Sequence, residues 1–331
     1  MKIAIVILNW NGKALLEQFL PSVMQYSSEH ADIYVADNGS TDNSLDFLNS
    51  NYPEIKIINN DRNYGFAQGY NMALKQVVAD IYCLLNNDVE VEANWLSPII
   101  AMFNSQPETA IIQPKILNYH QKDQFDYAGA AGGFIDKYGF PYCRGRVFET
   151  IEKDHGQYDD SMPIFWASGA CLFIRQQHYW DLNGMDDQFF AHMEEIDLCW
   201  RSYNSGATIL YNGNCVVYHL GGGTLHKSNP RKTYLNFRNS LFMLTKNLPG
   251  RSLFSTMFTR LFLDGIAAIW FLLQLKPQHT FAVLKSHFSF YMNLKRLLSQ
   301  RNTIQPRENY YMIKSVVWAY FIDKKRTYKR L

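Results

Sequence analysis

Short apolar segments alternate with amphipathic segments through the first hundred residues of the chain. These apolar segments are rich in residues that favour β-structure and predict β-strands at residues 3–8, 33–36, 55–58 and 81–85. The segments between them repeat apolar residues every three to four positions and predict helices at residues 13–25, 42–50 and 65–78. Fully apolar strands separated by helices are typical of a parallel sheet covered on both faces. The sequence therefore predicts an α/β fold with a mostly parallel central sheet flanked by helices.

Each predicted strand in this region is followed by a short polar segment rich in asparagine, aspartate and glycine. The four polar segments occupy residues 9–12, 37–42, 59–63 and 86–88. Such residues are common in turns, so a single polar segment would indicate little. Parallel sheets, however, bind ligands at the carboxyl ends of their strands. Four successive polar strand ends therefore predict a ligand site at that edge of the sheet.

The pattern changes twice further along the chain. Residues 110–230 combine short strands with one clear helical stretch at about 194–205. Beyond Pro249 the chain is apolar and aromatic, and residues 261–275 are nearly all apolar apart from an interruption at Asp264. This segment of about 15 residues is shorter than the roughly 20 that span a bilayer, so we expect a buried helix or one lying in a membrane interface. We expect one domain at 1–245 and a C-terminal helical, apolar and aromatic extension at 246–331.

The composition excludes two classes of protein. With 47% hydrophobic and 19% charged residues, the chain is too apolar to be disordered. Its formal net charge of +2 argues against a nucleic-acid binder, which needs a concentrated basic face. Basic residues gather near the C-terminus in a run that suits anionic lipid head groups: Lys324, Lys325, Arg326, Lys329 and Arg330.

The cysteines and the first residues bear on location. Five cysteines are scattered without any C-x-x-C spacing, which predicts reduced and mostly buried thiols. The first apolar segment is short and leads into Asn9 without a small-residue cleavage site, so it predicts a strand rather than a signal peptide. We therefore expect a cytoplasmic protein.

Four segments together resemble the ordered signatures of a known family. They read VILNWNG at 6–12, VADNGSTD at 35–42, NYGFAQGYN at 63–71 and LLNND at 84–88. In this order they are similar to the family 2 inverting glycosyltransferases with the GT-A fold, most closely the bacterial rhamnosyltransferase-like branch. The resemblance covers about residues 1–245. It implies a nucleotide-binding half at 1–110 and an acceptor-binding, catalytic half at 111–245.

The resemblance implies a nucleotide diphosphate sugar as the donor, with dTDP-rhamnose or a UDP-hexose as candidates. Asp37 matches an aspartate that contacts the nucleoside, and a carboxylate accepts strong hydrogen bonds from a base or a sugar hydroxyl. A purely local role for Asp37 in a turn or helix cap stays open. Further donor-binding residues are expected at the same strand ends: Asn9, Asn11, Asn38, Asn63, Gly65, Asn71, Asn86, Asn87 and Asp88.

The diphosphate implies a divalent cation, either Mg²⁺ or Mn²⁺. Asp88 stands where the family has its D-x-D motif, but Asn86 replaces the first acid and leaves one carboxylate. His219 matches a histidine that completes metal coordination in some relatives, while a structural role for it stays open. We expect a metal site of Asp88 and His219 whose affinity depends on the donor.

Inverting transfer requires a base that takes the proton of the acceptor hydroxyl. The family supplies it from an acidic pair at the start of a helix, usually from the second position, which is Glu195 here. Because the family usually has aspartate at that position, Glu194 stays an alternative. The acceptor or sugar pocket is expected to contain Trp166, Ser168, Gly169, Asp197 and Arg201. Core packing is an equal alternative for the tryptophan, and the last two residues have the spacing of a structural i,i+4 pair.

Other functions compete with this one. A Rossmann dehydrogenase needs a G-x-G-x-x-G turn after the first strand, and residues 9–12 do not supply it. A non-catalytic nucleotide-sugar-binding relative stays an alternative because Asn86 replaces an acid. The hypothesis of a membrane-scaffold protein is supported by the apolar C-terminal region alone. The expected function is sugar transfer to a saccharide or polyprenyl-linked saccharide in cell-surface polysaccharide biosynthesis, with the C-terminal region at the inner face of the cytoplasmic membrane or in a homodimer.

Overall fold

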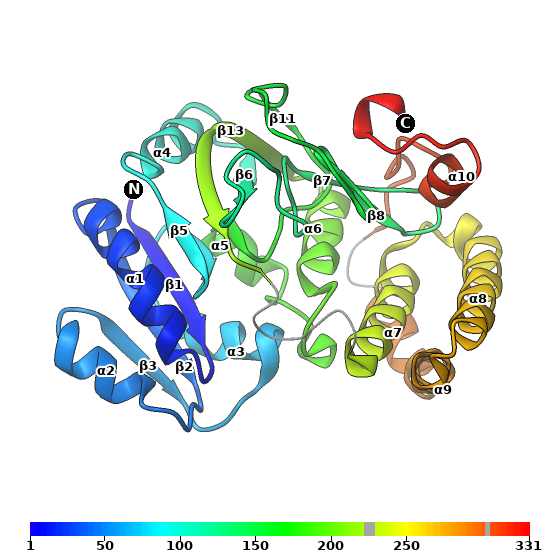
Figure 1. Cartoon of the computed structure of the whole chain (residues 1–331), viewed down its shortest axis with the longest axis horizontal. Coiled ribbons are helices and arrows are strands. Elements are labelled where there is room, and N and C mark those ends of the chain that lie inside the picture. Colours follow the sequence, from blue (N-terminus) through cyan, green and yellow to red (C-terminus); the bar gives the residue numbers. More distant parts are fainter. Residues whose placement is uncertain (222–228, 302–304) are drawn as a thin grey trace.

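The computed structural model describes residues 1–221, 229–301 and 305–331. Figure 1 shows the N-terminal strands and helices on one side of the molecule and the C-terminal helices on the other. The first four strands are β1 (Ile3–Asn9), β2 (Ala31–Asn38), β3 (Lys56–Asn60) and β4 (Ile81–Asn86). The helices between them are α1 (Lys13–Ser27), α2 (Ser44–Asn51) and α3 (Gly65–Leu74). The predicted alternation is confirmed, although α3 ends four residues before the predicted position.

Within the described residues, the central sheet has nine strands. Their order is β11-β13-β6-β12-β4-β1-β2-β3, with β5 paired to β13. The strands that follow β4 in this sheet are β5 (Val89–Val91), β6 (Thr109–Asn118), β11 (Ser161–Pro163), β12 (Cys171–Arg175) and β13 (Thr208–His219). The first four strands pair in parallel, as predicted. Because β12 runs antiparallel to both β4 and β6, the sheet as a whole is mixed.

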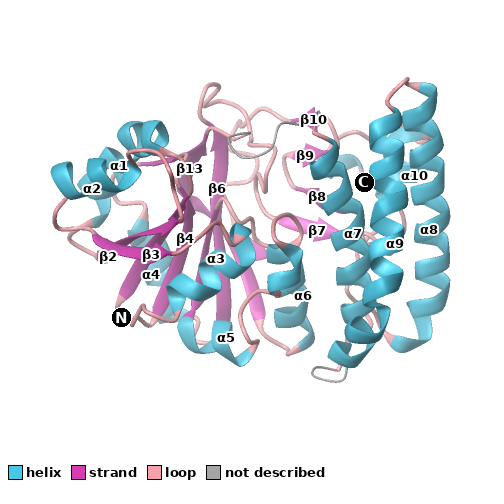
Figure 2. Ribbon diagram, turned by 90° about the horizontal axis from the view of Figure 1, so that it is seen from below, coloured by secondary structure: helices cyan, strands magenta, loops and turns pink. Residues whose placement is uncertain are grey.

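Both faces of the sheet are covered. Ile3, Ile5 and Ile7 of β1 pack in one core with α1 and α4 (Leu96–Ser105). Ala4 and Val6 face the opposite side and pack in a second core with α3 and α6 (Glu194–Asn204). The helices lie on both sides of the strands in Figure 2. The continuous apolarity of the predicted strands therefore has its expected cause. All five cysteines are buried and free, which confirms the prediction for them.

The chain between β6 and β11 forms a second, four-stranded antiparallel sheet. Its strands are β7 (Gly133–Ile135), β8 (Pro141–Cys143), β9 (Arg146–Val147) and β10 (Thr150–Ile151). Between β12 and β13 lie α5 (Gln176–Asp181), the 3₁₀ turn η1 (Asp187–Phe189) and α6. The helix predicted at about 194–205 is thus confirmed as α6.

The C-terminal region is helical, as expected. It contains α7 (Pro230–Asn247), α8 (Gly250–Leu273), α9 (Pro277–Gln300), α10 (Val316–Phe321) and the 3₁₀ turn η3 (Tyr328–Arg330). The expectation of an apolar helix of about 15 residues is wrong, because helical structure already begins at Gly250 and α8 has 24 residues. By length and composition this helix could cross a membrane, with a mean hydropathy of 1.5 over its most apolar window. The expected boundary at 245 falls in the last turn of α7.

Candidate active site

Asn9 joins the carboxyl ends of three strands. It is fully buried at the end of β1, where it lies opposite Asp37 of β2. Its amide nitrogen donates to Asp37 Oδ1 at 3.3 Å, and its carbonyl accepts from the Asn87 amide at 2.9 Å. Asp37 also accepts the Ser40 N–H at 2.9 Å. The structure thus brings together the polar strand ends that the sequence placed at one edge. We call Asn9, Asn11, Asp37, Asn38 and Asn87 the polar rim.

Asn11 holds the loop that follows β2. Its backbone has a positive φ of 49°, a conformation that asparagine tolerates better than most residues. Its Oδ1 accepts the N–H groups of Thr41 and Asp42 at 2.7 and 3.3 Å, and its own N–H donates to Ser40 Oγ at 2.9 Å. The side-chain oxygen of Asn11 therefore positions the neighbouring loop.

Asn38 of the polar rim is joined to Asn63 in a network of hydrogen bonds. The Asn38 amide donates to Asn63 Oδ1 at 3.2 Å and to the Gly65 carbonyl at 3.0 Å. Its Oδ1 accepts from the Asn60 amide at 3.1 Å and from the Tyr64 N–H at 3.3 Å. Asn63 Oδ1 also accepts the Gly65 N–H at 2.8 Å. Both Asn38 amide hydrogens and its oxygen are thus committed within the protein.

Asn71 ties α3 to the segment before η1. Its amide donates to the Met185 carbonyl at 2.7 Å and to Asp187 Oδ1 at 2.6 Å. Its Oδ1 accepts from the Tyr179 hydroxyl at 2.6 Å and from the Met185 N–H at 3.1 Å. Because the side chain is only 8% exposed and makes four internal hydrogen bonds, the geometry gives Asn71 a positioning role. None of these hydrogen bonds tests the prediction that Asn71 contacts the sugar donor.

Asp88 and His219 meet where β4 ends and β13 ends. His219 Nε2 lies 3.2 Å from Asp88 Oδ1, and its Nδ1 lies 3.2 Å from Asp126 Oδ2. The Asn86 amide lies 3.4 Å from the same Nε2, and the Gly221 N–H donates to Asp88 Oδ2 at 3.2 Å. The two predicted metal ligands are therefore neighbours, with Asp126 as a third member that the sequence did not indicate.

Charge pairing shifts the pKa values of this group. Burial raises the pKa of Asp88, but the adjacent His219 imidazole holds it below its ordinary value. Burial lowers the pKa of His219, but Asp126 and Asp88 raise it well above its ordinary value. Among the described residues, no three His, Cys, Asp or Glu side chains form a ready-made metal cage. A metal here would therefore take part of its coordination from the ligand.

Glu194 and Glu195 begin α6, and each has one carboxylate oxygen without a hydrogen-bond partner among the described residues. Glu194 is 4% exposed, and the Oε2 atoms of both residues are buried without a hydrogen-bond partner among the described residues. A Cβ placed on Gly169 would lie 3.9 Å from Glu195 Cβ. The next residue, Ala170, accepts the Asn86 N–H at 3.0 Å. The start of α6 therefore lies beside the end of β4.

The two carboxyls differ in their pKa. Burial raises the pKa of Glu194 well above its ordinary value, and the neighbouring Glu195 raises it further. Burial also raises the pKa of Glu195, but backbone N–H groups at the start of α6 offset part of this and leave it at about 7. Both pKa values are thus raised, which favours the protonated form of Glu194 and brings the titration of Glu195 close to neutral pH.

The loop before α6 is held in an unusual conformation. Phe190, His192 and Met193 have φ values of 65°, 70° and 72°, which are rare for residues other than glycine. The Asn239 amide on α7 donates to the His192 carbonyl at 2.7 Å and to two other carbonyls of the same loop. Gly65 permits the close approach of Phe190, since a Cβ there would lie 2.6 Å from its ring and carbonyl oxygen. Sequence reasoning missed Asn239, because α7 contains several polar residues and nothing in its sequence sets this amide apart.

Two residues expected in the acceptor pocket make only internal contacts. Trp166 is 4% exposed, and its indole N–H donates to the Phe134 carbonyl at 2.8 Å. Ser168 is 2% exposed; its hydroxyl donates to the Ala128 carbonyl at 2.7 Å, and its N–H donates to Gln113 Oε1 at 2.8 Å. These contacts fit the alternative that Trp166 packs in the core. Of this segment, Gly169 lies beside Glu195.

Asp197 and Arg201 form the predicted i,i+4 ion pair, with 2.9 Å between Asp197 Oδ2 and Arg201 Nε. Arg201 also donates to the Leu182 and Gly184 carbonyls. Asp197 is fully buried and accepts from Lys246 at 2.9 Å. This pair therefore joins α6 to its neighbours.

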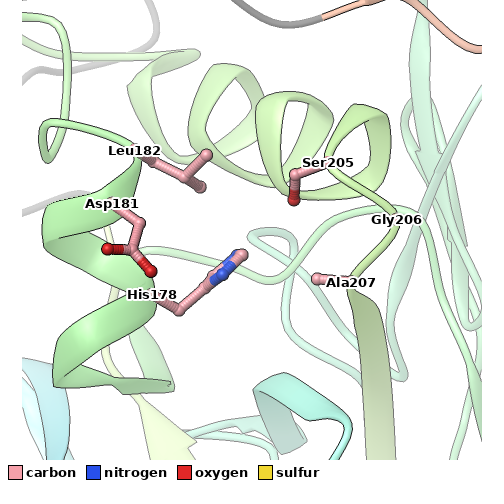
Figure 3. A pocket seen from close by; sticks show the side chains of 6 residues that line it. All are labelled: His178, Asp181, Leu182, Ser205, Gly206 and Ala207. Atoms are coloured by element: carbon pink, nitrogen blue, oxygen red, sulfur yellow. The ribbon is translucent and has the colours of Figure 1, made fainter.

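A surface depression of about 450 Å³ lies away from these residues. His178, Asp181 and Leu182 line one side, and residues 205–207 line the other (Figure 3). Residues 205–207 follow the C-terminal end of α6, whereas Glu194 begins it. A helix of 11 residues is about 16 Å long, so this depression is separate from the unpaired carboxylates.

A mixed sheet with a polar rim and an acidic pair at a helix start defines a glycosyltransferase of the GT-A fold. The chain belongs to Glycosyl transferase family 2, whose profile matches residues 4–181, more than half of the chain. The predicted family, fold and enzyme class are thereby confirmed. The protein is a glycosyltransferase that acts on a nucleotide sugar in glycan biosynthesis.

Two relatives show the breadth of the family. The chain is 23% identical over 233 residues to an N-acetylglucosaminyl-diphospho-decaprenol L-rhamnosyltransferase of Mycobacterium tuberculosis, covering 65% of this chain and 75% of that protein. It is 22% identical over 270 residues to the low-salt glycan biosynthesis hexosyltransferase Agl10 of Haloferax volcanii, covering 78% of this chain and 80% of that protein. The resemblance to the rhamnosyltransferase-like branch is thus confirmed.

Solved structures show the same fold. Residues 1–349 of S. aureus TarS in complex with UDP-GlcNAc match with a TM-score of 0.57 and 13% identity, over 92% of this chain and 93% of that one. GalNAc-T7 with UDP, GalNAc and Mn²⁺ matches with a TM-score of 0.59 and 16% identity, over 74% of this chain. The match spans about half of GalNAc-T7, at 48% of its length.

Proposed function

We propose that the protein is an inverting glycosyltransferase that moves rhamnose from dTDP-rhamnose, or a hexose from a UDP-hexose, to a saccharide acceptor in cell-surface polysaccharide biosynthesis. The observation that carries the proposal is the acidic pair at the start of α6. Glu194 and Glu195 each bury a carboxylate oxygen that has no partner among the described residues. A buried polar atom without a partner is costly, so such atoms indicate a place where a substrate supplies the missing hydrogen bond.

Glu195 is the proposed base. With a pKa of about 7, it is ionised in a large share of molecules at neutral pH and still accepts a proton effectively. It takes the proton of the acceptor hydroxyl as that oxygen forms a bond to the anomeric carbon. The bond from this carbon to the nucleotide diphosphate breaks on the opposite face. Glu194 keeps its proton and donates a hydrogen bond to a substrate oxygen.

The polar rim is the proposed donor site. Asp37, held by Asn9 and Ser40, faces the carboxyl edge of the sheet where the family's ligands bind. Asn86 and Asn87 continue this edge at the end of β4 and are both partly exposed. In this assignment Asn38, Asn63 and Asn71 act by fixing the shape of the site, since their amides are committed to internal hydrogen bonds.

Asp88 and His219 are the proposed ligands of Mg²⁺ or Mn²⁺. The Asp88 carboxylate supplies the oxygen ligand that these cations prefer, and His219 Nε2, 3.2 Å from it, would join the coordination once the ring has given up a proton. Asp126 lies on the other ring nitrogen, where an acceptor orients a ligating histidine. A bound divalent ion would supply positive charge to the leaving diphosphate.

We also propose that the acceptor is lipid-linked and that the protein works at the inner face of the cytoplasmic membrane. The name of the mycobacterial relative specifies an acceptor on decaprenyl diphosphate. In the present chain, α8 and α9 expose large apolar side chains along much of their length. A saccharide carried on a lipid is reached most readily by an enzyme that rests on the bilayer surface.

Thermal unfolding with a panel of nucleotide sugars, with and without Mg²⁺ or Mn²⁺, tests the donor site. A ligand that binds the folded state raises the unfolding temperature by mass action. We expect one donor to stabilise the protein only with metal, and Asp88→Ala to lose this response. Asp123→Ala is the matched control, because Asp123 is exposed and pairs with Lys153 at the surface. Stabilisation by no donor would contradict the proposal, and donor binding without turnover on any acceptor would favour a non-catalytic relative.

A further inference from the structure

Two apolar stripes run along the outer face of the α8–α9 hairpin. On α8 the exposed apolar residues recur every three to four positions, which places them on one side of the helix. They are Phe254, Phe258, Phe262, Ile266, Ile269, Trp270 and Leu273. On α9 the corresponding residues are Phe281, Leu284, Phe288, Tyr291 and Met292. α8 stands at the outer edge of the molecule beside α9 in Figure 2. We call these residues the hairpin face.

The opposite side of α8 is fixed to the protein. Arg260 is 4% exposed and pairs with Asp264 at 3.0 Å on the same helix. The Arg260 guanidinium also donates to the Tyr138 carbonyl at 3.2 Å and lies 4.0 Å from the centre of the Phe140 ring. His287 of α9 lies 3.4 Å from Asp264. Moving α8 into a bilayer as a span would break these buried contacts, so the helix stays on the domain and only its outer side is free.

The charges of the hairpin have one sign. Between Gly250 and Gln300, all of which the structure describes, the single acidic residue is Asp264, and it is 1% exposed. Lys285 and Lys295 are exposed on α9 beside the apolar stripe. Two copies docked through this face would bring like charges together without acids to pair them. A surface that is apolar and carries negative charge complements the hairpin better than a second copy of the chain does.

We propose that the hairpin face binds an anionic lipid bilayer, with α8 and α9 lying along the surface and their aromatic side chains entering the head-group region. The proposal deepens the membrane location given above and rests on it, but it names the surface and the lipid chemistry. An α8 of 24 residues is about 36 Å long, so the hairpin offers an extended contact. Trp270 lies near the α8–α9 turn, at a position where tryptophan favours the lipid interface.

Co-sedimentation of the full chain with liposomes tests the proposal without any substrate. The probes are vesicles of phosphatidylcholine alone and of phosphatidylcholine mixed with phosphatidylglycerol. We expect binding to the anionic vesicles, and a loss of about tenfold or more in Phe254→Gln/Phe258→Gln/Phe262→Gln, because three apolar side chains no longer leave water. Lys285→Gln/Lys295→Gln is expected to bind about tenfold less and to lose the preference for anionic vesicles. Val78→Gln, which changes a side chain that is 79% exposed near α3, is the matched control and is expected to bind normally.

The unfolding temperature and the donor response of each variant separate folding from lipid binding. All substituted residues are exposed, so both readouts are expected to match the wild type. A wild-type chain that stays in the supernatant with both vesicles would overturn the proposal. So would a triple phenylalanine variant that binds as well as the wild type, or a solution dimer that this variant converts to a monomer. A donor response that persists in each of these cases would leave the proposed transferase function standing.

Discussion

The polar rim and the start of α6 differ in how far their polar side chains are hydrogen-bonded within the protein. At the rim, the amide groups of Asn9, Asn11 and Asn38 form hydrogen bonds with neighbouring side chains and nearby backbone. At the start of α6, Glu194 and Glu195 keep buried oxygens without partners in the described part of the chain. The first arrangement fixes a shape, and the second leaves hydrogen-bonding capacity for something that arrives from outside.

This difference separates residues that position from residues that react. A satisfied amide network resists rearrangement, because each bond that breaks leaves a buried group without a partner. An unpaired carboxylate in a dry site has a raised pKa and is ready to exchange a proton. From the sequence, residues of both kinds were expected to bind a ligand. Their burial and hydrogen bonds now lead us to expect different effects when each is substituted.

Glu195→Gln gives the sharpest test of this comparison. We expect kcat to fall about a thousandfold, because a general base contributes about 10² to 10⁴ and glutamine cannot accept the proton. The measurement is turnover at saturating donor and acceptor near pH 8. Glu194→Gln is the matched variant, and it should retain far more activity, because the raised pKa of Glu194 favours its protonated form and glutamine can donate the same hydrogen bond. Equal losses in the two variants would break the assignment of separate roles.

Asn71→Ala tests the positioning side of the comparison. Removing a buried amide with four internal hydrogen bonds should lower the free energy of unfolding by about 2–4 kcal/mol. Chemical denaturation measures this value. The exposed Asn51→Ala is the control, and it should change stability by under about 1 kcal/mol. A stable Asn71→Ala protein that no longer binds donor would instead make Asn71 a direct ligand contact.

The pH dependence follows from the raised pKa of Glu195. Activity should rise with pH, reach half of its plateau at about pH 7 and level off above about pH 8, and at pH 6 it should be about tenfold below the plateau because the base is mostly protonated. The folded state holds this proton more tightly than the unfolded state, whose pKa is near the ordinary 4.5. The resulting contribution to stability is therefore complete below about pH 4.5 and is lost as the pH rises through about 7.

Unfolding experiments at several pH values check this linkage. Glu195→Gln lacks the titrating group, so its stability relative to the wild type should increase between about pH 4.5 and pH 8. A stability difference that stays constant over this range would contradict the raised pKa.

Asn11→Ala should have the smallest effect. The substitution removes the acceptor for two loop N–H groups and places alanine at a positive φ, which together cost about 1–2 kcal/mol. Asn11→Gly relieves the backbone strain and should cost less. Chemical denaturation of both variants separates the two contributions, and equal losses would show that backbone conformation contributes little here.

The first half of the fold was predictable because its signal is local. The inner parallel strands β1 and β4 are buried on both faces, so nearly their whole sequence is apolar, and polar residues mark their ends. The antiparallel placement of β12 between β4 and β6 has no such signal, since strand order depends on contacts between distant segments. The length of α8 was underestimated for a related reason: its first turns contain serine and threonine residues that do not extend the apolar segment.

The site was predictable by residue type and less so by role. Asp88 and His219 are adjacent, as expected from the family's pattern, but Asp126 comes from a loop without any distinguishing sequence. Trp166 and Ser168 were expected to line the acceptor pocket, and only the structure shows that they are buried and hydrogen-bonded within the protein. Burial and hydrogen-bond partners are properties of the folded neighbourhood, so they cannot be read from one segment.

The ion-pair network around Asp186 has a consequence for how this protein can be shortened or recombined. Lys246 pairs with both Asp186 and Asp197, and Arg296 of α9 reaches Asp186 at 3.3 Å. A chain ending at residue 245 would leave the buried Asp186 carboxylate without both of its cations and would leave Asp197 paired with Arg201 alone, which costs several kcal/mol. The C-terminal helices therefore cannot be exchanged between homologues as a detachable module. A change in these helices has to be accompanied by a matching change in the segment that leads to Glu194 and Glu195.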